Sequence, residues 1–550
     1  MHTLRLKLET NKREEAIINK RFYAISHIHN VLVKHAKKLL ITLEHDKLYQ
    51  SYLFEYKELL KKEKDYKSAS KDKKTKDAID LEELKFTKED LIRKKELSSL
   101  MNERRIDLGL SKAKFESYSN KLSKRYSKLI SSQQRQKEAN RVWSAVEAYL
   151  FGKGKQIHYK KNRDFDTITS KSNTNGVKFD INNFSIDWLG LNLKCKLPKR
   201  ESELLYIIES LKDKRSLEEK QTKTGNEIDL ISFCEIERKM FPNGWHYYVV
   251  VYIKGPAPKK LKINKNATTN ITGIDIGTST IATVSDDKVL LRELAPRCKE
   301  YNKQIERLNR SLEISRRNSN PDKYNPDDTI RRRTKEEKKL NPWIYSKNYY
   351  KKQNRLKSLY RQKSAYIKQC HEELCNELIS NSTTFIVENM NFQALQKRAK
   401  TTERSEKETE VKTKDGTSKV IKKFKKKKRF GKSLNNRAPS LLLKILDQKC
   451  LQYGGALFRV NTQTFRASQY NHSTNSCEKI TLKTRSKVVD GQYVQRDLYS
   501  AFLLKNSNIE LTAPDRNKCL AGFKDFLKLQ EELIAKMKTN NISMKQCFGF

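Results

Sequence analysis

Three carboxylates that are far apart in the sequence occur in settings that suit chemistry. Asp275 lies between Ile274 and Ile276 in the segment ITGIDIGTSTIATV, so on a strand its side chain points away from both isoleucines. A carboxylate within such an apolar strand needs a partner, and a metal ion is one option. Asp275 is therefore the least ordinary of the three acids.

Two further acids lie at the ends of predicted elements. Glu388 ends the strand-like part of TTFIVENMNF and faces away from Phe385 and Val387. Asp497 stands at the start of the helical segment QRDLYSAFLL. Taken singly, Glu388 is explained as a strand-end charge and Asp497 as an N-cap. The functional interpretation rests on the three acids together.

Together the three acids suit a site for divalent metal ions. Three carboxylates at one place repel one another, and bound Mg²⁺ relieves that repulsion. Two ions about 3.5–4 Å apart clamp the attacking and leaving oxygens of a phosphodiester displacement. We therefore expect two Mg²⁺ per site, with Mn²⁺ as a substitute, and attack by water that leaves a 5′-phosphate and a 3′-hydroxyl.

Three short motifs carry a resemblance to a known family. GIDIGT at Gly273–Thr278, IVEN at Ile386–Asn389 and QRDLYSAF at Gln495–Phe502 resemble the split motifs of a RuvC nuclease domain. Their order and spacing resemble the TnpB family of transposon-encoded RNA-guided DNA endonucleases, relatives of the compact type V CRISPR effectors. The resemblance is strongest over residues 265–510. It implies an α+β multidomain chain, with an RNase H-like (RuvC) α/β nuclease domain, a β-barrel wedge domain and a helical recognition lobe.

The resemblance also implies a function. It implies a metal-dependent endonuclease that cuts double-stranded DNA matched to a guide RNA from its own locus, next to a short flanking motif. Asp275, Glu388 and Asp497 carry over as its catalytic and metal-binding residues. Because all three positions are filled, an active enzyme is expected, in the cytoplasm of a prokaryote and associated with the nucleoid.

One region departs from the family pattern. Many relatives carry a zinc ribbon of two CxxC knuckles before the third motif, whereas here Asp490 and Gly491 stand where Cys-Gly is expected. His472 and Cys477 alone could bind zinc in this region, and a structural zinc site needs four N or S ligands. No zinc is therefore expected. We predict that His472 is a hydrogen-bonding structural residue in a metal-free insertion that contacts nucleic acid.

Two other functions are left open. GIDIGTST also resembles the first phosphate loop of actin-like ATPases, but no second glycine-rich loop follows, and Gly454-Gly455 is typical of a helix-to-strand turn. The second alternative is a nuclease-inactive RNA-guided DNA-binding protein or a transposition accessory. Such relatives usually lose an acid, and nicking of a guide-matched plasmid with Mg²⁺ separates them from an active enzyme.

The composition favours a nucleic-acid partner. The chain has 550 residues, with 116 Lys and Arg against 66 Asp and Glu, a net charge of +50. That length predicts about three to four domains, and 24 Tyr, 21 Phe and 4 Trp are too many for a disordered polycation. A body so charged repels itself unless a polyanion neutralises it. Nucleic acid is the first candidate and an acidic membrane surface the second.

Other classes of protein are excluded by pattern. No apolar run approaches the roughly 18 residues that span a bilayer. The segment MHTLRLKLET lacks the apolar region of a signal peptide. The nine cysteines are scattered and none forms CxxC, which favours reduced thiols inside a cell.

The chain is expected to alternate between strand and helix. Strands are predicted at 3–9, 184–193, 246–253, 271–284, 383–388 and 456–461. Helices are predicted at 12–149, 201–217, 347–380, 438–451, 497–504 and 515–538. A solvated lysine-rich loop is predicted at 62–76. The helix at 347–380 is expected to share one apolar face among Leu356, Tyr360, Ile367, Leu374 and Leu378.

These elements and the resemblance predict the domain boundaries. Residues 1–10 and 152–265 are predicted to form a β-rich wedge domain, and 11–151 a helical recognition lobe. Residues 266–464 and 496–510 are assigned to the nuclease domain, with a charged loop at 401–432. The zinc-ribbon-like insertion covers 465–495, and a helical tail covers 511–550.

Basic side chains are the candidates for phosphate contacts. On the helix at 347–380, Lys352, Arg355 and Arg361 are expected to track phosphates, while Tyr349 and Tyr350 either stack on bases or pack in the core. The segment KVIKKFKKKKRFGK holds nine basic residues in fourteen. It is either a flexible loop or a backbone contact. Its predicted contact residues are Lys425, Lys426, Lys427, Lys428 and Arg429.

Overall fold

The computed structural model is a mixed α and β structure of two compact units, Met1–Pro258 and Lys259–Phe550. It describes the chain except residues 70–85, 213–229, 242, 260–266, 268, 327–328, 332–340, 397–403, 413–417, 425–429, 479–483, 541 and 543–550. Within the described part, no helix has the length and apolar character needed to cross a membrane.

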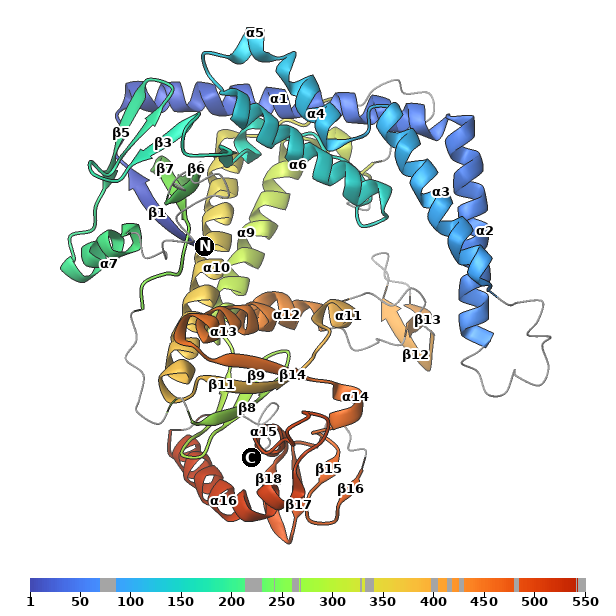
Figure 1. The fold of residues 1–550 in the computed structure, drawn as a ribbon, viewed down its shortest axis with the longest axis vertical. Helices are drawn as coiled ribbons and strands as arrows, with labels where there is room; N and C mark the ends of the chain where they lie inside the picture. Colours follow the sequence, from blue (N-terminus) through green and yellow to red (C-terminus); the bar gives the residue numbers. More distant parts are fainter. Residues whose placement is uncertain are drawn as a thin grey trace. The chain divides into compact units, whose positions relative to one another are not determined.

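The first unit combines one seven-stranded sheet with a set of helices (Figure 1). The strand order is β2-β6-β7-β1-β5-β4-β3, so the N-terminal strand lies between two strands from late in the unit. The elements are β1 (His2–Leu8), α1 (Lys12–Glu44), α2 (Lys47–Ala69), α3 (Lys88–Asp107), α4 (Lys112–Asn120), α5 (Ser123–Tyr126), α6 (Ser132–Leu150), η1 (Asn162–Asp164), β2 (Thr167–Thr169), β3 (Val177–Asp180), β4 (Ser185–Trp188), β5 (Leu191–Lys196), α7 (Glu201–Leu211), β6 (Ile231–Phe241) and β7 (Gly244–Ile253).

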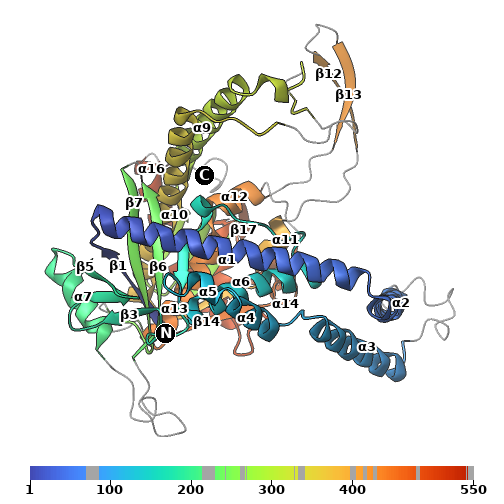
Figure 2. The ribbon, with the colours of Figure 1, turned by 90° about the horizontal axis from the view of Figure 1, so that it is seen from above.

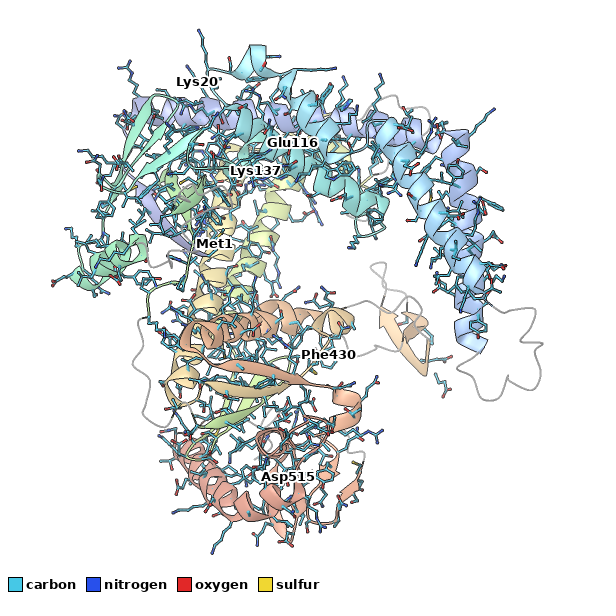
Figure 3. All side chains as sticks on the ribbon, in the orientation of Figure 1. Met1, Lys20, Glu116, Lys137, Phe430 and Asp515 are labelled. Atoms are coloured by element: carbon cyan, nitrogen blue, oxygen red, sulfur yellow. The ribbon has the colours of Figure 1, made fainter. Side chains whose placement is uncertain are left out.

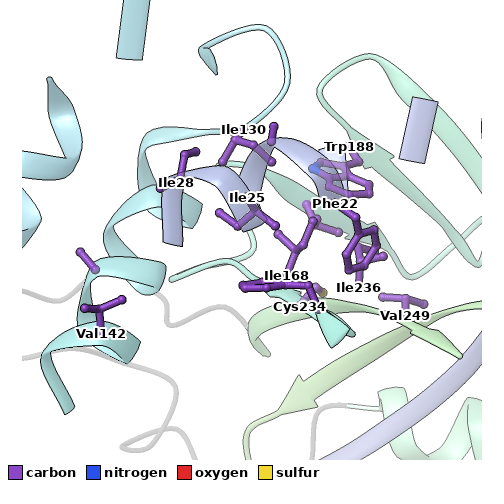
Figure 4. Close-up of a cluster of buried hydrophobic side chains, with 14 of the residues drawn as sticks. Phe22, Ile25, Ile28, Ile130, Val142, Ile168, Trp188, Cys234, Ile236 and Val249 are labelled. Carbon is purple, nitrogen blue, oxygen red and sulfur yellow. The ribbon is translucent and has the colours of Figure 1, made fainter. Parts of the chain in front are cut away.

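The long helix α1 supplies one side of the core of this unit. Asn11 and Glu14 form a capping box that fixes where α1 begins. Phe22, Ile25 and Ile28 recur at helical spacing on its buried face. Figure 4 shows them gathered with buried side chains of the sheet and of the following helices, including Ile130, Val142, Ile168, Trp188, Cys234, Ile236 and Val249.

The second unit contains a five-stranded sheet with helices on both faces (Figure 1). Its elements are β8 (Ile271–Ile276), β9 (Thr280–Val284), β10 (Val289–Glu293), α9 (Cys298–Asn318), η2 (Pro321–Lys323), α10 (Lys347–Asn381), β11 (Thr384–Glu388), α11 (Phe392–Gln396), β12 (Arg404–Lys412), β13 (Ser418–Phe424), α12 (Gly431–Arg437), α13 (Pro439–Tyr453), β14 (Ala456–Val460), α14 (Thr462–Phe465), β15 (Tyr470–Asn471), β16 (Ser476–Cys477), β17 (Ser486–Val489), β18 (Gln492–Gln495), α15 (Arg496–Lys505) and α16 (Arg516–Thr539). Asp515, labelled in Figure 3, caps α16.

The sheet order in this unit is β10-β9-β8-β11-β14. Strands β8, β11 and β14 are parallel, whereas β9 and β10 run antiparallel to their neighbours. One face, which carries Ile274 and Val387, packs against α10 and α13. The other face, which carries Ile386 and Ala282, packs against α15 and α16. The carboxyl ends of β8 and β11 therefore lie side by side.

Most of the predicted elements are present near their predicted bounds. Strands at 271–284, 383–388 and 456–461 and helices at 347–380, 438–451 and 515–538 are confirmed, each shifted by a few residues at most. The parity change near Gly190 is a two-residue turn, in which Leu189 and Gly190 both have positive φ. Helix α7 is described from Glu201 to Leu211, and part of 201–217 lies outside the described residues.

Three expectations about loops and burial were wrong in whole or in part. The lysine-rich loop predicted at 62–76 is helical up to Ala69, where α2 ends, and residues 70–76 lie outside the described residues. Its described charges pair with α3 through Lys62–Asp90 and Lys94–Glu63. The segment at 401–432, expected to be a charged loop, contains the hairpin β12–β13, in which Glu408 and Lys422 are register partners. Tyr360, expected in the buried face of α10, is 48% exposed.

Candidate active site

Two of the predicted acids lie together at the carboxyl ends of two neighbouring strands of the five-stranded sheet. The register of the parallel pair β8–β11 places Val387 opposite Ile274, so Asp275 and Glu388 each follow by one residue. Strand alternation puts both on the face opposite to Ile274 and Val387. That is the face covered by α15. The fold therefore brings Asp275 and Glu388 to neighbouring strand ends beneath one helix.

The glycine of the first motif explains how close that helix approaches. A Cβ added to Gly273 would lie 2.0 Å from the carbonyl oxygen of Ala501 and 2.4 Å from the nitrogen of Lys505. Gly273 and Asp275 share one face of β8, and Ala501 lies one helical turn after Asp497. Because Gly273 has no side chain, α15 can pack directly on β8. Asp275 follows Gly273 by two residues, so it lies next to this contact.

Asp497 lies in the first turn of α15, and the expectation that it is the N-cap was wrong. Gln495 is the N-cap, because its side chain accepts the N–H of Leu498. The buried carboxylate of Asp497 accepts hydrogen bonds from Arg496, at 3.1 and 2.9 Å. The guanidinium of Arg485 lies 3.6 Å away. Sequence reasoning missed both arginines, although Arg496 is the immediate neighbour of Asp497 in the third motif.

The three acids influence one another electrostatically. Burial raises the pKa of Asp275 well above its ordinary value, and the charges of Asp497 and Glu388 raise it further, whereas Arg496 and Arg485 oppose that shift. Burial also raises the pKa of Glu388, against a hydrogen bond from the N–H of Ala467. The charges of Asp497 and Glu388 therefore act on the carboxyl of Asp275. This repulsion also favours binding of a cation, which would relieve it.

The donor chemistry of this site suits a hard divalent ion, because its three candidate ligands are all carboxylates. Among the described residues, however, no three His, Cys, Asp or Glu side chains converge closely enough to hold a metal ion. The carboxylate of Asp497 is held by Arg496 and Arg485 instead. The residue types therefore fit the expected ion, while the described geometry pairs one ligand with arginine.

The predicted phosphate contacts lie on other elements. Lys352, Arg355 and Arg361 are on the first half of α10, where Arg355 is exposed and the other two are partly exposed. The described contacts do not connect them with the three acids. Lys425, Lys426, Lys427, Lys428 and Arg429 lie outside the described residues.

The region of the missing zinc ribbon consists of two small hairpins, β15–β16 and β17–β18. Buried His472 lies with Nδ1 2.7 Å from the Tyr499 hydroxyl, which confirms its predicted hydrogen-bonding role. Lys487 donates to the carbonyl of Tyr470 at 2.9 Å, and its ammonium lies 4.0 Å from the ring centroid of Tyr499. Cys477 is exposed. A lysine and a histidine thus tie these hairpins to α15.

The glycine pair considered for an ATPase has a packing role. Gly454 ends α13 with a positive φ, and β14 starts at Ala456. A Cβ on Gly455 would lie 1.9 Å from the carbonyl oxygen of Thr383. Both glycines are accounted for by the helix-to-strand turn that the sequence predicted, so they give no support to an adenosine-binding loop.

Comparison with known proteins gives a weak likeness and no family. No family model matches the chain, and no curated protein matches it. The chain is similar to one in the cryo-EM structure of the Cas12f1–sgRNA–target DNA complex, with 12% identity and a TM-score of 0.39, over 92% of this chain and 99% of that one. The chain is also similar to one in a cryo-EM structure of a CRISPR–Cas12f ternary complex, with 11% identity and a TM-score of 0.26, over 92% of this chain and 99% of that one.

Proposed function

We propose that the chain is an RNA-guided DNA endonuclease of the TnpB type, with Asp275, Glu388 and Asp497 as its hydrolytic centre. The placement of the acids carries the proposal: two end neighbouring parallel strands, and the third lies in the first turn of the helix packed on the same face. Three parallel strands extended by an antiparallel hairpin also suit the RNase H-like core that the motifs imply.

The residues have distinct roles in this proposal. Bound Mg²⁺, or Mn²⁺ in its place, would neutralise the scissile phosphate and lower the pKa of an attacking water. Asp275 and Glu388 would hold the ions from the sheet, and Asp497 would hold them from the helix. Arg485 and Arg496 lie beside Asp497 and would meet the negative charge of the phosphate.

A guide RNA is proposed because the three acids come from the second unit alone, which leaves the first unit available for another role. All three acids lie in Lys259–Phe550, so Met1–Pro258 supplies none of the three carboxylates. The net charge of +50 also suits a partner with many phosphates, and a structured RNA would supply them. We propose that the β-rich and helical parts of the first unit hold that RNA.

The test is guide-dependent cleavage. The RNA that co-purifies with the chain is sequenced, its guide portion is changed, and a plasmid matched to the new guide is incubated with Mg²⁺. Cutting should follow the new guide, and Asp275→Ala should abolish it while DNA binding stays within a few-fold. Asp525→Ala removes an exposed acid of α16 and should leave cutting unchanged.

The other outcomes separate the alternatives. Equal cutting of matched and mismatched plasmids after RNase treatment would leave an unguided metal-dependent nuclease. Guide-dependent binding by the wild type without cutting would favour the nuclease-inactive protein or the transposition accessory. Cutting retained in Asp275→Ala would remove Asp275 from the centre.

A further inference from the structure

A cluster of aromatic side chains stands where α9 ends and α10 begins. The two helices lie side by side in Figures 1 and 2. The ring centroid of Tyr345 is 4.6 Å from that of Tyr349 and 6.0 Å from that of Tyr350, and the last two are 6.0 Å apart. We call Ile344, Tyr345, Tyr349 and Tyr350 the aromatic tip.

The aromatic tip is not part of the hydrophobic core. None of its members belongs to a core cluster among the described residues. Ile344 is 65% exposed and Tyr350 is 41% exposed. The tyrosines instead pack on one another in tilted and edge-to-face geometries. Of the two explanations for Tyr349 and Tyr350, core packing is therefore disfavoured.

Buried polar residues fix the backbone that carries the tip. Asn320, 2% exposed, donates to the carbonyl of Ile344 and accepts its N–H, both at 2.7 Å. The buried ammonium of Lys323 donates to the carbonyl of Asn341 at 2.6 Å. Ser346 caps α10 by accepting the N–H of Tyr349. These bonds hold an exposed apolar surface in place, which lowers the entropy cost of binding a ligand there.

The charge around the tip identifies the ligand. From Lys347 to Gln369, α10 has no acidic residue. On α9, Glu313 is paired with Arg316 and Arg317. The basic residues in that part of α10 are Lys347, Lys351, Lys352, Arg355, Lys357, Arg361, Lys363 and Lys368. A tyrosine cluster with Tyr350 exposed and Tyr345 and Tyr349 partly exposed precedes this acid-free basic stretch of α10. This combination matches a strand that carries both flat bases and phosphates.

We propose that the aromatic tip is a stacking site for unpaired bases of single-stranded nucleic acid, whose phosphates follow the first half of α10. The inference rests on the proposed function only for the source of the strand, a guide RNA or a displaced DNA strand. Bases have two apolar faces that stack on tyrosine, whereas paired bases inside a duplex do not offer them.

The test measures binding without cutting. Full-length Asp275→Ala protein, freed of RNA, is titrated with 12-nucleotide single-stranded RNA, the same DNA sequence, and versions in which bases are replaced by abasic sites. Tyr345→Ala and Tyr350→Ala should each weaken binding to the normal strands about 5- to 150-fold, as loss of one stacked base does. Binding to the abasic strands should change less than twofold. The tighter of the RNA and DNA arms identifies the source.

Two control variants test whether the tyrosine rings of the tip are responsible for binding. Tyr350→Phe retains the ring and should bind as the parent does, while Tyr360→Ala removes an exposed tyrosine of the same helix outside the tip and should have no effect. Equal losses on normal and abasic strands, a loss in Tyr360→Ala, or no loss in any variant would overturn the stacking site. Failure of guided cleavage with base-dependent binding intact would overturn the proposed function alone.

Discussion

The carbonyl oxygen of Ala501 on α15 lies 2.0 Å from the point where a Cβ of Gly273 on β8 would stand. No side chain fits there, so the helix rests directly on the strand. Asp497 lies one turn before Ala501, and Asp275 lies two residues after Gly273. This contact therefore determines how closely Asp275 and Asp497 approach each other, although they lie far apart in the sequence of the second unit.

Replacement of Gly273 by alanine should destabilise the second unit and abolish cleavage. The added methyl must displace backbone atoms of α15, and overpacking of this kind costs about 1–3 kcal/mol or more. We expect a lower midpoint in thermal or denaturant unfolding. The matched control is Gly522→Ala on α16, where a Cβ would lie 3.7 Å from Phe502, an ordinary contact. That change should stabilise the chain by up to about 1 kcal/mol. Equal effects of the two changes would contradict the role given to Gly273.

The sequence could predict the strands and helices that carry the acids, because each has strong periodicity around its motif. It predicted that Asp275 faces away from its flanking isoleucines, and the core cluster containing Ile274 and Ile276 agrees with this. It could not predict the register of β8 against β11, which depends on parallel pairing between distant segments. The sequence also could not predict why residue 273 must be glycine. The reason is its contact with a helix more than two hundred residues later.

Other features escaped prediction for local reasons. The segment at 401–432 has the composition of a solvated loop, and its hairpin depends on backbone pairing between β12 and β13 that composition does not predict. Gln495 competes with Asp497 as the N-cap, and the sequence alone favours the acid because Asp is the commoner cap. Arg485 reaches Asp497 from the loop before β17, a contact that only the fold creates.

Asp275 should make the stability of metal-free protein depend on pH. Its pKa is raised in the folded chain, so the folded state binds the proton more tightly than the unfolded state. The protonated carboxyl therefore stabilises the folded state. This stabilisation is complete below the unfolded pKa of about 3.9 and is lost as pH rises through the folded pKa. Asp275→Asn should therefore gain stability relative to wild type as pH rises from about 4 to neutrality, measured by thermal unfolding in chelator.

Magnesium gives the matching readout for the same residue. Added Mg²⁺ should raise the melting temperature of the wild type, because an ion that binds only the folded state stabilises it. Asp275→Asn should lose most of this response, whereas Asp525→Asn, at an exposed position of α16, should retain it. Identical pH profiles and Mg²⁺ responses in all three proteins would show that Asp275 is neither strained nor a ligand.

Lys487 should make the two small hairpins more stable in alkali. Burial lowers its pKa to about 8, below the unfolded value of about 10.4. The unfolded state then binds more protons between these values, so stability should rise as pH increases from about 8 to 10.4. Lys487→Met should lose this rise, and Lys524→Met, on the exposed side of α16, should keep it. Parallel profiles for wild type and Lys487→Met would contradict the burial of a strained ammonium.

Purified protein should contain no stoichiometric zinc. His472 is engaged with Tyr499, and the described residues beside it supply no set of four N and S ligands. Elemental analysis should find well below one zinc per chain, and a zinc-selective chelator should leave the melting temperature unchanged. One zinc per chain, or unfolding on chelation, would refute this prediction.

The positive charge should act on phosphates rather than on base sequence. Affinity for duplex DNA should fall steeply with salt, with a slope of log affinity against log salt of about 0.9 for each phosphate neutralised. Replacing Lys425–Arg429 with Gln or Ser should weaken binding to all sequences alike and flatten that slope, because backbone contacts carry no sequence information. Lys524→Gln with Lys528→Gln removes exposed charges of α16 and should leave the slope nearly unchanged. A loss confined to one target sequence, with the slope preserved, would mean that this basic segment reads bases instead.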